Sequence, residues 1–428
     1  MLVYIPYVES LERLVAEPNR PTVTEWINRC REALDGGPSR EIYRIANPTD
    51  LKVSGAFFTG RELAAKALTK IQTEGCRPKF FDPACGTGDL LLEVARRLEI
   101  RSSLYQTLKE WGKVLAGQDV NDSFTRATRA RLAILALNRG AGQKQSIKYN
   151  LEELFPLIST GDSLLDHSLY TPANQIIMNP PFNRVAAPIN CTWGSGKVTA
   201  AALFLELAIR KAVTGTHIIA ILPDVLRSGS RYNRWRRLVS NHAVIKEIRL
   251  CGVFNKRADI NVFILDLIAG KNDSQQMKWY QIEEPGKTIQ DYFHVSVGPV
   301  VPYRDKDKGN KHPYVHAKAL PKWSIVKEFE ERRGYDGKLF KPPFVVVRRT
   351  SRPGDERRAI ATIIRGIHKV AVENHLIVIE PEDGTLKSCK SLIKHLNSDH
   401  IDQWLDQRIR CRHLTVSAVK EIPWWGNP

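Results

Sequence analysis

The sequence lacks the long apolar runs, signal-like leader and paired cysteines that would place the chain in a membrane or outside the cell. Its longest apolar stretches, such as residues 218–222, fall far short of the roughly 18 residues that a membrane span needs. The first residues, MLVYIPYVESLERL, carry no basic lead and no small-residue cleavage site. Seven cysteines form no CxxC pair, which argues against a disulfide framework and a zinc ribbon. We therefore expect a cytoplasmic protein with no membrane contact and no metal centre.

An excess of positive charge is the main feature of the composition. The 428 residues include 64 lysines and arginines and 46 acidic residues, which leaves a formal net charge of +18. Residues 271–428 hold 28 of the basic and 20 of the acidic residues, so the excess is spread over both parts of the chain. This balance indicates a polyanionic partner, and if that partner is DNA or RNA both parts are expected to touch it.

The chain divides by pattern into three parts, of which the first fifty residues read as mainly helical. From about residue 51 to residue 270, short β-rich runs alternate with amphipathic stretches such as 90–98 and 124–136. This alternation predicts an α/β fold with a mostly parallel sheet covered on both faces. Beyond about residue 275, helical and strand-like pieces mix, which predicts a second domain of α+β character. The predicted strands of the sheet are 79–82, 114–118, 146–149, 175–178, 217–222, 244–250 and 261–268.

The segment FFDPACGTGDLL, residues 80–91, places a glycine turn between a predicted strand and a predicted helix. Gly86 and Gly88 permit a tight turn and let a ligand approach the backbone, and the helix offers unpaired N–H groups at its start. No lysine follows the turn, so it is not a phosphate-binding P-loop. Asp82 before the turn suits a ligand that carries an ammonium or sulfonium charge. A purely structural turn is the alternative.

Two further acidic residues follow the next predicted strands. Asp119 comes 37 residues after Asp82, at the place where an α/β nucleotide site binds a ribose, because a carboxylate accepts hydrogen bonds from both hydroxyls. The nearby Asp122 is better interpreted as a helix cap. Asp162 is a candidate acceptor for an adenine amino group, with an ordinary turn residue as the alternative.

The most specific motif is IIMNPPF, residues 176–182, in which an asparagine and two prolines follow an apolar strand. Two successive prolines fix the backbone and remove two donors, so the carbonyls of this turn can accept hydrogen bonds. The amine of a base is a poor nucleophile because its lone pair is delocalised. The side-chain oxygen of Asn179 and the carbonyl of Pro180 can hold its two hydrogens and favour a pyramidal nitrogen. Phe182 can then stack on the planar substrate, and a rigid loop is the alternative.

With these motifs in this order, the sequence resembles the class I S-adenosylmethionine-dependent methyltransferases. Among them it is similar to the gamma arrangement of N6-adenine DNA methyltransferases, strongly over residues 50–270 and more loosely beyond. The resemblance implies S-adenosylmethionine as cofactor and a Rossmann-like seven-stranded catalytic domain over 51–270. It also implies a helical N-terminal segment over 1–50 and a C-terminal α+β target-recognition domain over 275–428. The catalytic residues that it implies are Asn179, Pro180, Pro181 and Phe182.

The resemblance also assigns the cofactor site. The segment GAFFTG, residues 55–60, matches a motif that usually reads FFTP and lies over the methionine part of the cofactor, and Gly60 replaces the usual proline. Asp119 is implied to hold the ribose and Asp162 the adenine. Phe254 is expected beside the extruded base together with Phe182, with a buried strand-end residue as the alternative. The implied cofactor-binding residues are Phe58, Thr59, Asp82, Ala84, Cys85, Gly86, Gly88, Asp119, Asp162 and Asn179.

Two arginine-rich stretches are candidates for contact with DNA. Clustered guanidinium groups suit phosphates and give salt-sensitive affinity, although such runs also form solvated faces. The C-terminal part is expected to choose the DNA sequence, because the catalytic motifs account for only a cofactor and one base. The predicted DNA-binding residues are Arg231 and Arg234, after the fifth strand, and Arg348, Arg349 and Arg352 in the C-terminal part.

These features predict a site-specific enzyme that flips an adenine out of double-stranded DNA and methylates its N6 atom. It would serve as the modification component of a restriction–modification or phage-defence system. The sequence contains no convincing nuclease signature, so any DNA cleavage is expected in a partner chain, such as a separate restriction endonuclease or another defence subunit. Two alternatives stay open. One is a methyltransferase of the same motif set that acts on RNA or on protein glutamine, and the other is a non-catalytic DNA-binding subunit that keeps the fold.

Overall fold

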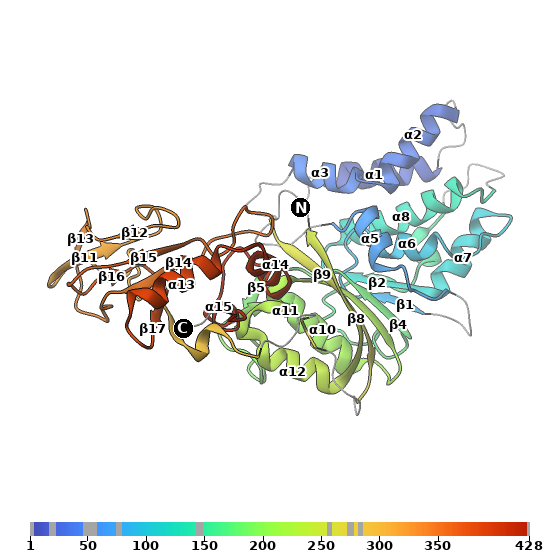
Figure 1. Cartoon of the computed structure of the whole chain (residues 1–428). Helices are drawn as coiled ribbons and strands as arrows, with labels where there is room; N and C mark the ends of the chain where they lie inside the picture. The colour runs from blue at the N-terminus through green and yellow to red at the C-terminus, as the bar shows by residue number, and fades with distance from the viewer. Residues whose placement is uncertain are drawn as a thin grey trace. The chain divides into compact units, whose positions relative to one another are not determined.

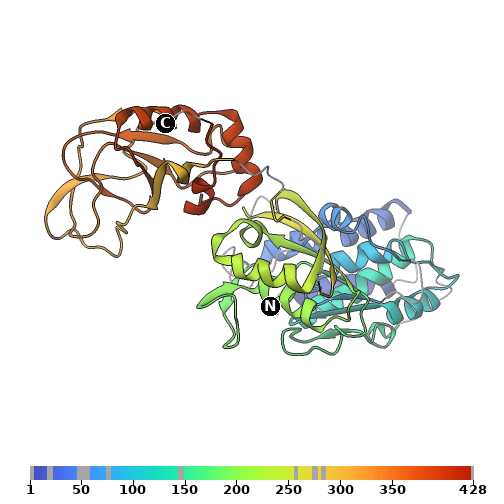
Figure 2. The same cartoon turned by 60° about the horizontal axis from the view of Figure 1, so that its bottom comes forward.

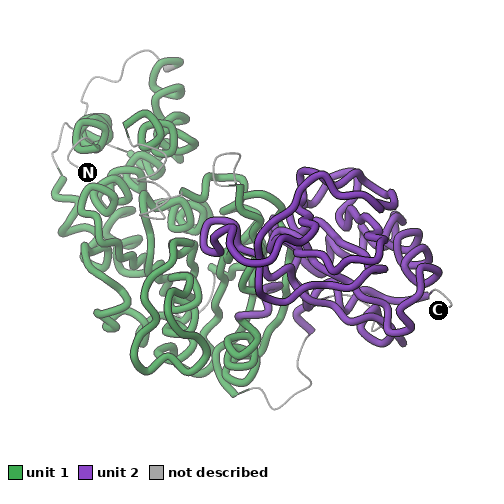
Figure 3. Tube along the Cα trace, turned by 90° about the vertical axis from the view of Figure 1, so that its left-hand side faces the viewer, with its two compact units in different colours: residues 1–226, 232–277 green, residues 227–231, 278–428 purple. Residues whose placement is uncertain are grey.

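The computed structural model describes residues 4–16, 23–45, 58–73, 79–142, 149–254, 259–271, 278–280 and 286–425. The chain forms two compact units (Figure 1 and Figure 3). The first comprises residues 1–226 and 232–277, and the second comprises residues 227–231 and 278–428. In the second unit, Arg227 of the short segment donates from Nη1 to the carbonyl of Gln407 at 2.8 Å.

A seven-stranded sheet forms the centre of the first unit. Its strand order is β3-β2-β1-β4-β7-β9-β8, and β9 runs antiparallel to the other six, which are parallel. The predicted α/β class with a mostly parallel sheet is therefore confirmed, and six of the seven predicted strands overlap the observed ones. The strands are β1 (Phe80–Asp82), β2 (Leu115–Asp119), β3 (Ile158–Thr160), β4 (Gln175–Met178), β7 (His217–Pro223), β8 (Ala243–Val253) and β9 (Asn261–Ala269).

The predicted third strand, 146–149, lies mostly outside the described residues, and its last residue, Tyr149, is not in a strand. The edge of the sheet is instead β3, which pairs with β2 from Gly117↔Ile158 to Asp119↔Thr160. Three residues of sequence Ile-Ser-Thr are too few to give a period-two signal, so their strand follows from pairing with β2 rather than from local pattern.

Helices cover both faces of this sheet (Figure 1 and Figure 2). One face carries α5 (Arg61–Ala67), α6 (Asp89–Ala95), α7 (Leu104–Val114) and α8 (Asp122–Asn138), and the other carries α10 (Ala200–Lys211) and α12 (Asn233–His242). Three N-terminal helices complete the unit, and the first two of them pack on α8. They are α1 (Ile5–Ala16), α2 (Val23–Leu34) and α3 (Gly37–Ile45).

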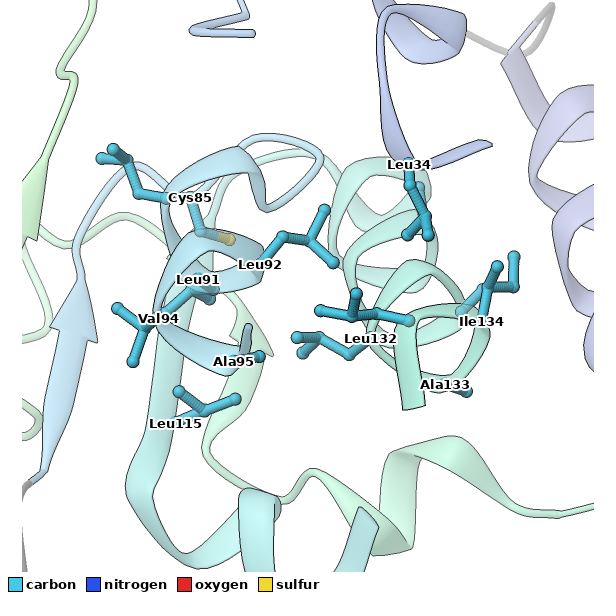
Figure 4. Packing of buried hydrophobic residues seen from close by; sticks show 14 of the residues in the cluster. Leu34, Cys85, Leu91, Leu92, Val94, Ala95, Leu115, Leu132, Ala133 and Ile134 are labelled. Carbon is cyan, nitrogen blue, oxygen red and sulfur yellow. The ribbon is translucent and has the colours of Figure 1, made fainter. Parts of the chain in front are cut away.

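Buried apolar residues of α6 and α8 pack against one another in the core of the first unit (Figure 4). Leu92 of α6 and Leu132 of α8 lie between the two helices, while Leu34 at the end of α2 approaches α8. Because α1 and α2 cover α8, almost every residue from 123 to 137 is buried, although the sequence predicted one apolar face. The cap of α8 is Asn121 and not Asp122, which is the first residue of the helix, since the Asn121 side chain accepts from the N–H of Ser123 at 3.1 Å. Within the described ranges, no helix combines the length and apolarity needed to cross a membrane.

The second unit is built around a five-stranded sheet of order β10-β17-β14-β15-β12. Alternate residues of β14 face two different cores: Val345 and Val347 pack with the C-terminal helices, whereas Phe344 and Val346 pack on the opposite face. Its strands are β10 (Phe293–Val297), β12 (Ile325–Val326), β14 (Phe344–Arg348), β15 (Ala361–Ile364) and β17 (Leu376–Pro381). A smaller sheet holds β11 (Lys311–Val315), β13 (Arg332–Gly334) and β16 (Ala371–Val372), and the helices are α13 (Leu386–Leu396), α14 (Asp399–Arg408) and α15 (Val416–Lys420).

Candidate active site

The glycine turn that follows β1 packs tightly against α8. Gly86 and Gly88 have φ angles of 52° and 87°, which glycine adopts without strain. A Cβ atom on Gly88 would lie 2.7 Å from Cγ2 of Thr128, and the Thr128 hydroxyl donates to the carbonyl of Gly86 at 2.9 Å. The turn therefore needs glycine at position 88 for both its backbone angle and its packing.

Asp119 ends β2 and connects the loops on either side of it. Its carboxylate accepts hydrogen bonds from the N–H of Gly86 at 3.0 Å and from the N–H of Asn121 at 2.9 Å, one on each oxygen. Each oxygen keeps a second lone pair, so the group can still accept from two hydroxyls. Burial raises the pKa of Asp119, and these two hydrogen bonds oppose the shift.

Asp82 ends β1 and is only 2% exposed. Burial raises the pKa of its carboxyl group to about 8, and repulsion from Asp119 and Asp89 adds to the shift. A hydrogen bond from the N–H of Ala84 at 3.1 Å acts in the opposite direction. At neutral pH this carboxyl group is therefore largely protonated, and a nearby cation would favour its ionised form.

We expect Asp82 to make the protein less stable as the pH rises. Its pKa is about 8 in the folded chain against 3.8 ordinarily, so the folded state binds the extra proton between these values. The contribution of this proton to the free energy of unfolding is complete below pH 3.8 and is lost as the pH rises through 8. Urea unfolding at several pH values should show a slope from this group of at most about 1.4 kcal/mol per pH unit. Asp82→Asn should remove that slope, and an unchanged slope would mean that Asp82 is ionised in the folded protein.

Asn179 joins the motif after β4 to the motif near residue 59. Its Nδ2 atom donates to the Thr59 hydroxyl at 3.0 Å, across 120 residues of sequence. Because an amide carries its oxygen on the other side from its nitrogen, this bond fixes where the Asn179 oxygen lies. Pro180, which follows, is buried, so the turn is held by packing as well.

A pocket of about 250 Å³ lies where β1, β2, β3 and β4 end. Its walls come from the glycine turn, the end of β2, the segment after β3 and the Asn179 motif. From the predicted sites it brings together Phe58, Ala84, Gly86, Asp119, Asp162, Asn179 and Pro181. A second cavity of about 30 Å³ is lined by Phe58, Thr59, Asp82, Ala84, Cys85, Gly86 and Asn179, so Asn179 is on the wall of both. Of the predicted catalytic, cofactor-binding and base-stacking residues, four line neither cavity: Gly88, Pro180, Phe182 and Phe254.

The pocket also contains residues that sequence reasoning missed. Phe124 of α8 lies on its wall, and its ring stands 5.2 Å from the ring of Phe58 at 78°. Val120 lines it too and is 68% exposed. A valine directly after a strand-end acid was the one available signal in the sequence. Asp162 lines the pocket, and its side chain also accepts from the N–H of Leu164 at 2.9 Å, as in a turn.

Phe182 and Phe254 come together although they belong to motifs far apart in the sequence. Their ring centroids are 5.6 Å apart and the rings meet edge to face at 79°. Both residues are half-buried. This places the two predicted stacking residues beside each other.

The predicted DNA-binding arginines differ in their surroundings. Arg231, Arg234 and Arg352 are exposed. Arg348 and Arg349 are half-buried, and each donates to a backbone carbonyl of the second unit, at 2.6 Å and 2.9 Å respectively. Two aromatic residues lie close to Arg231 in the sequence, namely Tyr232 and Trp235. Both are buried core residues, which the sequence pattern did not indicate.

Gly60 stands where the resembled family has proline, and its φ of 72° is one that proline cannot adopt. Its N–H donates to Asp89 Oδ2 at 2.7 Å, and Asp89 Oδ1 accepts from Nη1 of Arg131 at 2.9 Å. Arg131 is 1% exposed, and its Nε donates to the carbonyl of Ala33 in α2 at 2.8 Å. Hydrogen bonds therefore connect α2, through Arg131 and Asp89, to the segment that carries Thr59.

Proline at position 60 is expected to destabilise the protein even though the family usually has it. Gly60→Ala keeps the N–H and meets no atom within 4 Å, so it should cost about 1–2 kcal/mol of backbone strain. Gly60→Pro also removes the bond to the Asp89 carboxylate and should cost roughly 1.5–3 kcal/mol more. Urea unfolding measures both variants, and equal stabilities for the two would contradict the role of the Gly60 N–H.

The sheet order, with one reversed strand, and the pocket at the carboxyl ends of its parallel strands define a class I methyltransferase fold. The sequence profile described as N-6 DNA methylase matches residues 43–291, more than half of the chain, and the chain belongs to this family. That result confirms the predicted family and the predicted class of enzyme. No curated protein matches the chain.

Solved structures similar to this chain include restriction–modification proteins. The type IIL enzyme MmeI, solved in complex with DNA, matches with a TM-score of 0.53 and 10% identity over 94% of this chain and 67% of its own. The M protein of the type I restriction enzyme EcoKI matches with a TM-score of 0.38 and 19% identity, over 52% of this chain and 46% of its own. A type I methyltransferase subunit from Streptococcus thermophilus matches with a TM-score of 0.36 and 16% identity, over 51% of this chain and 45% of its own. The chain thus spans about half of the length of these two type I proteins.

Proposed function

We propose that this chain transfers the methyl group of S-adenosylmethionine to the N6 atom of adenine at a specific site in double-stranded DNA. The observation that carries the proposal is the position of Asn179 on the wall of both cavities, held there by its bond to Thr59. An amide at this point can hold a target amine next to a cofactor that is bound in the two cavities.

The residues of the two cavities fit S-adenosylmethionine. Asp119 keeps acceptor capacity for the ribose hydroxyls, and Asp162 offers a carboxylate for the adenine amino group. Phe58 and Phe124 provide apolar surface for the purine ring. Asp82 in the smaller cavity can balance a positive charge once it is ionised. When bound, the cofactor supplies an electrophilic methyl group.

The side chains of the Asn179 motif prepare the target amine. The Asn179 oxygen and the Pro180 carbonyl accept its two hydrogens, which directs the nitrogen lone pair out of conjugation with the ring. Phe182 and Phe254 would lie beside the extruded base, and because their rings touch edge to face, the base would stack on one of them and not between them. Acceleration then comes mainly from alignment and electrostatic placement, and no strong base is required before the transfer.

We assign catalysis to residues 51–270, a helical covering to residues 1–50, and recognition of the DNA sequence to residues 275–428. The cavities that carry the proposed chemistry are lined by residues of the first unit. Reading several base pairs requires other side chains that reach base edges in a groove. Arg352 is exposed in the second unit and Arg234 in the first, so both units offer cations for phosphate contact.

The chain is proposed to act as a modification component in restriction–modification or phage defence. This context is supported by the family and by the restriction–modification proteins with similar structures. In that setting a separate endonuclease or another defence subunit is the expected partner.

Transfer of a labelled methyl group from S-adenosylmethionine tests the proposal. The purified chain should label adenine-containing duplex DNA and leave structured RNA unlabelled. Preferential labelling of RNA would support the alternative of an RNA methyltransferase. Specific binding of DNA without any transfer would support a non-catalytic subunit.

A further inference from the structure

A hairpin rises directly from the proposed catalytic motif. Its antiparallel strands are β5 (Arg184–Ala186) and β6 (Lys197–Thr199), and it begins two residues after Phe182. The Thr199 hydroxyl donates to the carbonyl of Phe182 at 3.3 Å, and the Thr199 N–H donates to the hydroxyl of Tyr232 at 3.1 Å. The base of the hairpin and the position of Phe182 are therefore fixed together.

The far part of the hairpin is also anchored. Trp193 is 3% exposed, and its Nε1 donates to Glu206 of α10 at 2.6 Å. Its ring centroid lies 6.1 Å from that of Tyr232. The N–H of Ala187 donates to the carbonyl of Gly196 at 2.7 Å and extends the pairing beyond the strands. Both ends of the hairpin are thus held in place on the first unit.

Ile189, near the tip, is fully exposed at 110% of its reference area. Single exposed apolar residues are ordinary on protein surfaces, and it is the location of this one that matters. Arg184 and Lys197 on the two strands are exposed cations. The segment 183–199 contains no acidic residue. An anchored cationic hairpin attached to the catalytic motif therefore presents one branched apolar side chain to its surroundings.

We propose that this hairpin contacts the DNA duplex and that Ile189 enters the base stack beside the extruded adenine. This inference rests on the proposed function, since it concerns how the target base leaves the helix. Apolar side chains that insert between base steps unstack them, and an extruded base leaves a gap that such a side chain can fill. Arg184 and Lys197 would contact the neighbouring phosphates.

The test compares Ile189→Ala with a matched control, Val213→Ala. Val213 is also an exposed β-branched residue, at 54%, but it precedes β7 at the opposite end of the strands from the pocket. Each protein is assayed on a duplex in which the target adenine is paired and on the same duplex with an abasic site opposite it. The target site is first identified from the methylation pattern of the unaltered chain.

We expect Ile189→Ala to lower kcat/KM on the paired duplex by roughly tenfold or more, because extrusion then lacks its wedge. On the duplex with the abasic site the loss should be under about threefold, since that adenine is already unpaired. Val213→Ala should change neither rate, and the affinity for S-adenosylmethionine should be the same in all three proteins.

Two results would overturn the wedge role of Ile189. One is equal activity of Ile189→Ala and Val213→Ala on the paired duplex, and the other is an equal loss on both duplexes. Failure of the unaltered chain to methylate either duplex would instead overturn the proposed function, and it is recognised without any variant.

Discussion

Asn179→Ala is expected to lower the rate of methyl transfer by a factor on the order of 10²–10³, the usual cost of losing one preorganised hydrogen-bonding group. The side chain lies on the wall of both cavities, where the target amine would meet the methyl group. Its loss should act on kcat, because the interaction strengthens as the amine nitrogen becomes pyramidal. Single-turnover methylation measures the loss of rate, and calorimetry with S-adenosylmethionine measures the affinity for the cofactor separately.

Thr59→Val provides the companion variant for Asn179→Ala. It keeps the size of the side chain and the Asn179 oxygen, but it removes the group that accepts from Asn179 Nδ2 at 3.0 Å. We expect a smaller loss of rate, roughly tenfold, the cost of one lost hydrogen bond of about 1.5 kcal/mol. Turnover of Asn179→Ala close to that of the unaltered chain would contradict the proposed role of this residue.

Asp119→Ala is expected to weaken the binding of S-adenosylmethionine by roughly 30-fold to 10³-fold, or about 2–4 kcal/mol, since hydrogen bonds to a charged group are lost. The carboxylate braces the glycine turn and can accept from a ribose at the same time. Calorimetry on the purified protein measures the change in affinity.

Thr128→Val separates the effect of Asp119 on the glycine turn from its proposed contact with the ribose. The Thr128 hydroxyl donates to the carbonyl of Gly86 from behind the turn and does not line either cavity. Its removal loosens the turn without taking a ligand contact away, so affinity should fall by less than tenfold. If Thr128→Val weakens binding as much as Asp119→Ala, then Asp119 acts on the turn and not on the ribose.

The sheet could be predicted from the sequence because its strands are buried on both faces and read as apolar runs. β4 and β7 are examples, since nearly every residue in them is buried. β3 was misplaced because three residues carry too little pattern. The strand-end acids were found because the carboxyl ends of parallel strands meet at one edge, which brings Asp119 and Asp162 to one pocket.

Contacts between distant segments could not be predicted from the sequence. Arg131 looks like a solvent-facing charge on a helix, yet it is buried because α2 covers α8 and supplies carbonyls for its guanidinium group. The bond between Asn179 and Thr59 joins two motifs that were interpreted separately. The contact of Phe182 with Phe254 likewise depends on where the end of β8 lies relative to the Asn179 motif, which only the three-dimensional fold determines.

Nucleoside analysis of DNA tests adenine methylation by this chain most directly. DNA is taken from cells that lack their own adenine methylation and that express either the unaltered chain or Asn179→Ala. We predict N6-methyladenosine at one recurring sequence with the unaltered chain and a much lower level with the variant. N4-methylcytosine in its place, or N6-methyladenosine at an undiminished level with Asn179→Ala, would contradict the proposed chemistry of the Asn179 site.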